Sequence, residues 1–196
     1  GSATESGSQS VTLTIEENES APTVTLSTSA TSIDENSGSV LTLTATLSVA
    51  TTADVTVTIG TSGTATEGTD YTDGSGNIDD LVITAGNTTE TISFKPTDDS
   101  VYEGDETATI SIDSVSGGEA SENGTQAVTI TISENESAPT VTLSVSASSI
   151  AENSGSTLTI TATSSIVADE NITVGISTSG TETEDKDYGT ISDITI

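Results

Sequence analysis

The side chains that could do chemistry in this sequence are almost all carboxylates. Its 196 residues include 31 Asp and Glu but only two Lys, with no His or Cys, and the formal net charge is −29. The lack of His and Cys excludes imidazole bases, thiol nucleophiles, disulfides and the usual zinc sites. The scarcity of basic residues excludes a protein that binds the phosphate backbone of nucleic acids. The remaining chemistry is that of carboxylates and backbone carbonyls, which are the ligands of hard cations.

The elements that position these acids are predicted to be strands. Aliphatic residues alternate with Thr and Ser in VTVTI at 55–59, ATISI at 108–112 and VTITI at 128–132. This period of two is typical of half-buried strands. The low aromatic content of 2% and the extreme charge leave disorder as the competing interpretation. Because the alternation recurs and no helical period is sustained, we expect an all-β fold.

Seven strands are expected between residues 21 and 137, separated by turns rich in Gly, Asn and Pro. Their predicted ranges are 23–28, 40–48, 54–61, 80–84, 90–95, 106–113 and 127–133. Seven short strands without a helix predict an immunoglobulin-like, seven-stranded antiparallel β-sandwich.

The order of the strands predicts that the acids gather at one end of the sandwich. Each strand crosses the domain, so successive connections alternate between its two ends. One end then holds Asp34, Glu35, Glu67, Asp70, Asp73, Asp98, Asp99, Glu103, Asp105, Glu106, Glu134 and Glu136. Two carboxylates about 4 Å apart repel by roughly 1 kcal/mol in water and by more where they are partly buried. A bound cation would neutralise them, and Ca²⁺, which accepts about six to eight oxygens in flexible geometry, suits such loops better than Mg²⁺.

The sequence also repeats itself with an offset of 117 residues. The segment VTLTIEENESAPTVTLS at 11–27 returns as VTITISENESAPTVTLS at 128–144. A fixed period of this length predicts tandem repeats. We expect the C-terminal strand of a preceding repeat plus a linker at 1–20, a complete repeat at 21–137, and the first four strands of the next repeat at 138–196.

Three motifs in this order resemble the Calx-beta domain family over essentially all of 21–137. They are ENSG at 35–38, GTATEGTDY at 63–71 and VITAGNTTETISFKPTDDSVYEGDETATISI at 82–112. The family includes regulatory domains of sodium–calcium exchangers, segments of integrin-β4 and tandem arrays in bacterial surface proteins. The resemblance implies calcium ligands in three connections and after the last strand. One departure is that the family's run of Asp after that strand is replaced by Ser-Glu-Asn-Glu at 133–136.

Matched by motif, the implied metal ligands are Glu35, Asp70, Asp98, Asp99, Glu103, Glu106, Glu134 and Glu136. Weaker candidates lie in the preceding tail and in the next copy, namely Glu17, Glu19, Glu152 and Asp187.

The expected function is a calcium-binding structural extender repeat of a long secreted or cell-surface adhesin or extracellular fibre, with Ca²⁺ stiffening the junctions between repeats. The expected partners are neighbouring repeats of the same chain, with lateral or head-to-tail self-association left open, and neither nucleic acid nor membrane insertion. One alternative is a calcium-sensing regulatory domain of the exchanger type. Another is an acidic spacer that binds no metal. An enzyme is not expected, because a glycosidase with paired carboxylates would also need aromatic side chains for its sugar, and the chain has few.

Overall fold

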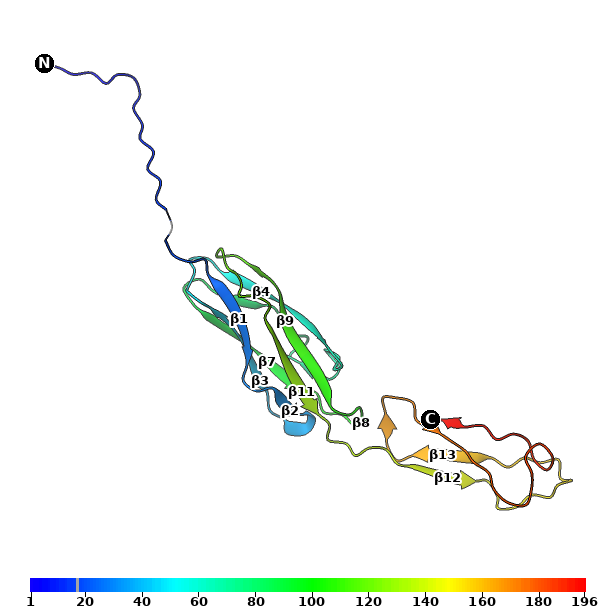
Figure 1. The fold of residues 1–196 in the computed structure, drawn as a ribbon. Helices are drawn as coiled ribbons and strands as arrows, with labels where there is room; N and C mark the ends of the chain where they lie inside the picture. The colour runs from blue at the N-terminus through cyan, green and yellow to red at the C-terminus, as the bar shows by residue number, and fades with distance from the viewer. Residues whose placement is uncertain (17) are drawn as a thin grey trace.

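The structure, a computed structural model, describes residues 1–16 and 18–196. Figure 1 shows an extended N-terminal segment, a central sandwich and a smaller set of strands near the C-terminus. Strands begin at Thr23, and the sandwich ends at Ser133. The described residues include no helix with the length and hydrophobicity needed to span a membrane.

The central part is a sandwich of two five-stranded sheets, which confirms the predicted fold. The first sheet has the order β10 (Ser121–Glu122), β1 (Thr23–Thr28), β3 (Leu41–Leu47), β7 (Thr89–Pro96) and β5 (Tyr71–Thr72). The second sheet has the order β2 (Ser32–Asp34), β11 (Ala127–Ser133), β9 (Glu106–Ser116), β4 (Val55–Gly63) and β6 (Leu81–Ile83). The seven expected strands are all present, and the short strands β2, β5 and β10 extend the sheets.

Alternation in the sequence becomes a buried face and an exposed face in each long strand. In β3 the side chains of Leu41, Leu43, Ala45 and Leu47 are buried, while the Thr residues between them face outward or are half-buried. The two largest core side chains are Tyr71 and Phe94, whose rings stack with centroids 4.7 Å apart. With so few aromatic residues, this pair fills the part of the core next to the acidic connections.

A glycine permits the close approach that starts the connection containing Asp70. Gly63, at the end of β4, has φ of +128°, and a Cβ there would lie 2.0 Å from the carbonyl oxygen of Thr107. The Ala65 N–H donates to that carbonyl at 3.0 Å. Any other residue at position 63 would clash there. Glycine therefore allows the chain to turn tightly from β4 into the connection that carries Asp70.

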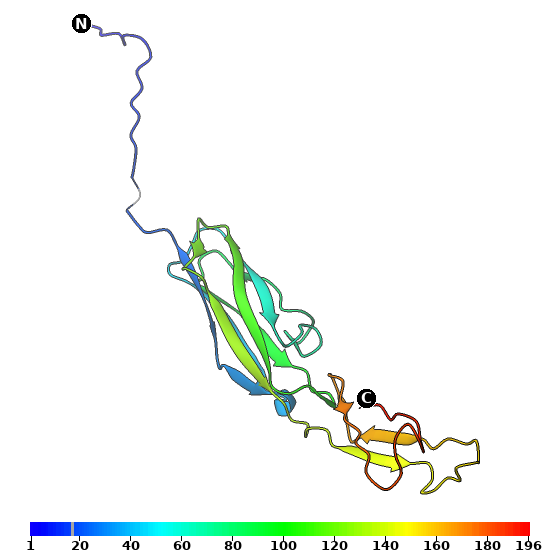
Figure 2. The ribbon, with the colours of Figure 1, turned by 45° about the vertical axis from the view of Figure 1, so that its right-hand side comes forward.

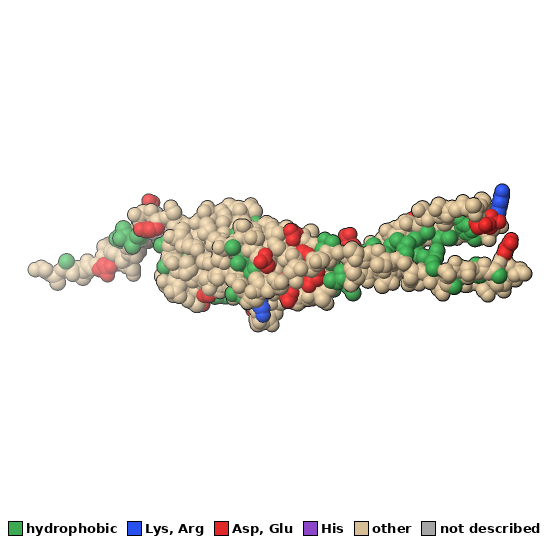
Figure 3. Space-filling view, turned by 90° about the horizontal axis from the view of Figure 1, so that it is seen from below, with side chains coloured by type: hydrophobic (Ala, Val, Ile, Leu, Met, Phe, Trp, Pro, Cys, Tyr) green, Lys and Arg blue, Asp and Glu red, His purple; other side chains and the backbone are tan. Residues whose placement is uncertain are grey.

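Residues beyond 138 form short strand pairs. β12 (Val141–Val145) pairs with β13 (Ile160–Ser164), and β15 (Thr173–Val174) pairs with β16 (Ile194–Thr195). Hydrophobic side chains are visible on the surface of this part in Figure 3, and Leu143 is 55% exposed.

Local contacts recur at the expected offset. The Thr183 N–H donates to Asp187 as the Thr66 N–H donates to Asp70. The division of the chain into three repeat segments stays a prediction.

Candidate metal centre

The first acidic connection turns Glu35 inward. The chain leaves β2 and forms a short 3-10 turn, η1 (Glu35–Ser37), which ends at Gly38 with φ of +63°. Glu35 is only 7% exposed, and its Oε1 accepts a hydrogen bond of 3.2 Å from the Asp99 N–H. The turn therefore places a buried carboxylate against the connection between β7 and β9, which we call the E–F connection (97–105).

The second acidic connection holds Asp70 next to the core. Asp70 is 9% exposed and accepts a hydrogen bond of 2.5 Å from the Thr66 N–H. Its backbone carbonyl accepts a bond of 2.9 Å from the Thr97 N–H. Asp70 is therefore fixed both to its own turn and to the start of the E–F connection.

Carboxylate side chains accept several of the N–H groups of the E–F connection. The Val101 N–H donates to Asp99 Oδ1 at 2.7 Å. The N–H groups of Glu103 and Gly104 both donate to Glu134 Oε2, at 2.6 and 2.8 Å. Glu134 follows β11 directly, so the end of the last strand and the E–F connection are joined through one side chain.

Carboxylate oxygens meet in three overlapping groups at this end of the sandwich. Within each group, one oxygen of every member lies within 4.8 Å of the others. The groups are Glu35 with Glu134 and Glu136, Glu35 with Asp99 and Glu103, and Asp70 with Glu103 and Glu106. We call these seven residues the acidic centre. Because Glu35 and Glu103 each belong to two groups, the three groups form one continuous array of carboxylates.

Burial and mutual repulsion make several of these acids hard to ionise. Loss of water, followed by the charges of neighbouring acids, raises the pKa of Glu35 from its ordinary value of 4.5 to about 7. The same two causes raise the pKa of Glu106 to about 7, with Asp70 the main charged neighbour. These two carboxyl groups therefore retain their protons to a higher pH than an exposed Glu does.

Glu134 differs from its neighbours because it accepts several N–H groups. Burial opposes its ionisation, but the N–H groups of Glu136, Glu103 and Gly104 outweigh that effect and hold the pKa of Glu134 at about 2. A side-chain hydrogen bond with Glu134 is the main cause that raises the pKa of the Glu136 carboxyl. One oxygen, Glu136 Oε2, is buried and has no hydrogen-bond partner among the described residues. A cation bound here would satisfy that oxygen, so the residues present fit a hard cation.

The chain matches a known domain family. The family model of the Calx-beta domain matches residues 17–136, more than half of the chain. The chain belongs to the Calx-beta family. The motifs at 35–38, 63–71 and 82–112 predicted this family, and the match confirms that prediction.

Solved structures of Calx-beta domains are similar at low sequence identity. One titled apo-form Calx CBD1 domain is 22% identical, with a TM-score of 0.46, over 58% of this chain and 98% of that one. One titled calcium binding domain CBD12 of CALX1.1 is 24% identical, with a TM-score of 0.42, over 52% of this chain and 41% of that one. A CBD12 structure from CALX1.2 is 23% identical, with a TM-score of 0.43, over 52% of this chain and 40% of that one. A search of curated proteins found no significant match.

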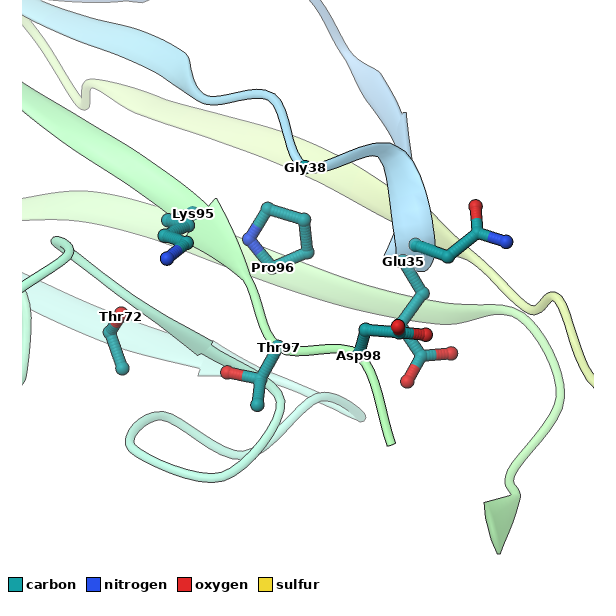
Figure 4. Close-up of a pocket in the computed structure, with 8 residues that line it drawn as sticks. Glu35, Gly38, Thr72, Lys95, Pro96, Thr97 and Asp98 are labelled. Carbon is teal, nitrogen blue, oxygen red and sulfur yellow. The ribbon is translucent and has the colours of Figure 1, made fainter. Parts of the chain in front are cut away.

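The acidic centre of this Calx-beta domain contains seven of the eight residues named from the motifs. Asp98 belongs to none of the three groups among the described residues. It lines a pocket together with Glu35, Thr72, Lys95 and Pro96, and Figure 4 shows its carboxylate beside that of Glu35. Asp98 thus lies at the margin of the centre.

The weaker candidates lie apart from the acidic centre. Glu17 lies outside the described residues. Glu19 and Glu152 are exposed, and Asp187 accepts the Thr183 N–H. None of these three belongs to a carboxylate group among the residues that the structure describes.

Asp169 is a further acid near the centre, and the motifs in the sequence did not indicate it. This residue follows β14 (Val167–Ala168), and its charge contributes to raising the pKa of Glu103, after burial and the charges of Asp70 and Asp99. Asp169 stands in the connection between β13 and β15, within the segment predicted to be the next repeat, so the tandem order of the repeats is the signal that could have revealed it.

We expect the stability of the metal-free Calx-beta domain to fall as pH rises from about 4.5 to about 7. Glu35 has a raised pKa, so above pH 4.5 the unfolded chain releases a proton that the folded domain retains until about pH 7. The expected loss is about 1 to 3 kcal/mol from this residue, and Glu106 acts in the same direction. Urea unfolding in chelator at pH 5, 6, 7 and 8 measures the slope. A flat profile from pH 5 to 7 would contradict it.

Proposed function

We propose that this Calx-beta domain binds Ca²⁺ at its acidic centre. The observation that carries the proposal is the continuous array of seven carboxylates. It includes Glu136, whose buried Oε2 has no hydrogen-bond partner in the part of the chain that the structure describes. Lys and Arg together number only two in the whole chain, so the protein itself offers little positive charge to balance the array. Ca²⁺ fits because it accepts many oxygens in irregular geometry.

The proposed role of the bound ion is mechanical. The acidic centre joins three connections to Glu134 and Glu136, which begin the segment leading out of the domain. A cation there would hold the exit segment against the sandwich and so stiffen the junction with the residues that follow. We propose a structural extender in a long secreted or cell-surface protein, with neighbouring repeats as partners. Modules in that setting usually bind calcium at about 10⁻⁴ to 10⁻³ M.

A second role, calcium sensing of the exchanger type, uses the same centre and is favoured by membership of the Calx-beta family. In that role, calcium would switch the angle between domains over a narrower concentration range. Small-angle scattering of a two-repeat protein, measured with and without calcium, distinguishes the extender role from the sensor role. An extender keeps one elongated shape and loses flexibility, whereas a sensor moves between two defined shapes.

Thermal unfolding of the full chain with calcium and with chelator tests the binding itself. Calcium at 100 times its dissociation constant should add about 2.7 kcal/mol, which raises the Tm of a domain of this size by roughly 10 °C. The double variant Glu103→Gln/Glu134→Gln should lose this increase. Glu119→Gln is the control, because Glu119 is exposed and lies in the connection before β10, at the other end of the sandwich. An equal Tm with and without calcium would leave the acids as a solubility feature only.

A further inference from the structure

One edge of the E–F connection is occupied by residues from the C-terminal part of the chain. The short strand β8 (Val101–Tyr102) lies between Asp99 and Glu103, and it pairs in parallel with β14, Val101 with Val167 and Tyr102 with Ala168. The Asp169 N–H extends this pairing by donating to the Tyr102 carbonyl at 3.1 Å. Figures 1 and 2 both show the two segments side by side where the sandwich meets the C-terminal part.

The position of β14 within its repeat shows which two ends the pairing joins. β14 lies in the connection between β13 and β15. At the repeat offset of 117 residues, it matches Ala50 and Thr51, in the connection between β3 and β4 of the sandwich. That connection lies at the end of the sandwich opposite to the acidic centre, the end at which the chain enters. The pairing therefore joins the exit end of one repeat to the entry end of the next.

Asp169 adds a negative charge to a junction that is already acidic. Its counterpart at the offset of 117 is Thr52, so the following copy carries an acid where the complete repeat does not. The charge of Asp169 acts on both Glu103 and Glu106. Without a cation this charge opposes the pairing of β14 with β8, and with a cation it favours that pairing.

We propose that β8 is a docking strand for the entry connection of the following repeat, and that Asp169 couples this docking to the cation at the acidic centre. Glu103 is then both a member of the acidic centre and a direct neighbour of the docking strand. Binding a cation on one repeat thereby orients the next. The docking stands on the pairing itself, and only its dependence on a cation rests on the proposed function.

Hydrogen exchange of the full chain, 1–196, tests the docking. The Asp169 amide is bonded to Tyr102, so it should exchange at least about tenfold more slowly in calcium than in chelator. The variant Asp169→Pro removes this N–H and should abolish the calcium-dependent protection of neighbouring amides in β8. It should leave the Tm of the sandwich unchanged within about 2 °C, because Asp169 lies outside both of its sheets.

Calorimetric titration with calcium tests the coupling. Asp169→Asn should weaken calcium binding about threefold to tenfold, because one nearby negative charge is lost. Glu170→Gln removes the same charge one residue further along and should change the affinity by less than about twofold.

The outcomes separate the two proposals. If calcium binds, but the Asp169 amide is unprotected and Asp169→Asn behaves like Glu170→Gln, the docking is wrong and the proposed function stands. If calcium does not bind, the proposed function and the coupling are both wrong. In that case, protection of the Asp169 amide in chelator supports the docking alone, and an unprotected Asp169 amide overturns it.

Discussion

Replacing Phe94 by Ala should lower the free energy of unfolding of the sandwich by about 3 to 5 kcal/mol. The Phe94 side chain is fully buried, and its ring stacks on Tyr71. The chain has one Phe, three Tyr and no Trp, so little aromatic surface is available to refill the cavity. Urea unfolding in saturating calcium measures the loss.

The substitution should also disturb the acidic centre, because Tyr71 directly follows Asp70 and pairs with Pro96 in β7. We expect calcium affinity to fall in the same variant. Val82→Ala is the control: Val82 is also on a strand but is 40% exposed, and its truncation should cost less than about 1 kcal/mol. A loss below about 1.5 kcal/mol for Phe94→Ala would mean that the stacked pair is not the centre of the core.

Glu35→Gln should have opposite effects on the metal-free and the calcium-bound domain. At pH 8 the buried Glu35 carboxylate is ionised beside Glu134 and Glu136, and burial already raises its pKa to about 7. A neutral Gln retains an oxygen for the Asp99 N–H and relieves the repulsion. The metal-free domain should therefore gain about 1 to 3 kcal/mol of stability.

Calcium binding should instead weaken about a hundredfold in Glu35→Gln, which corresponds to about 3 kcal/mol. The reason is that Glu35 belongs to two of the three carboxylate groups. Asp34→Asn removes one charge from the preceding, exposed position and should change both quantities little. Urea unfolding in chelator at pH 8 measures the gain in stability, and calcium titration at the same pH measures the loss of affinity. A Glu35→Gln variant that is less stable without calcium and binds calcium normally would show that Glu35 is a structural residue only.

Most of the sandwich could be predicted because its long strands carry their own signal. The ranges 23–28 and 127–133 agree with β1 and β11 at both ends, since alternation begins and stops there abruptly. β2, β5, β8 and β10 escaped prediction. Each has two or three residues, too few to display a period of two. β2, β5 and β10 pair with β11, β7 and β1 at the edges of the two sheets, and β8 pairs with the equally short β14.

The acidic centre was predictable at the level of loops but not of individual ligands. Strand order alone indicates that Glu35, Asp70 and the E–F connection share one end of the sandwich. It cannot separate Asp98 from Asp99, which are adjacent in the same connection. Asp99 is the one whose N–H meets Glu35. Asp169 was missed because strand order within one repeat carries no information about the neighbouring repeat.

The parallel pairing of β2 with β11 has a consequence for a chain under tension. The chain enters the sandwich at β1 and leaves it after β11 at the opposite end (Figures 1 and 2). Three residue pairs, from Thr131 with Ser32 to Ser133 with Asp34, join the two segments nearest the exit. A pull between residues 22 and 134 acts along these strands in shear. Their hydrogen bonds must then break together rather than unzip one by one, and that arrangement resists force best.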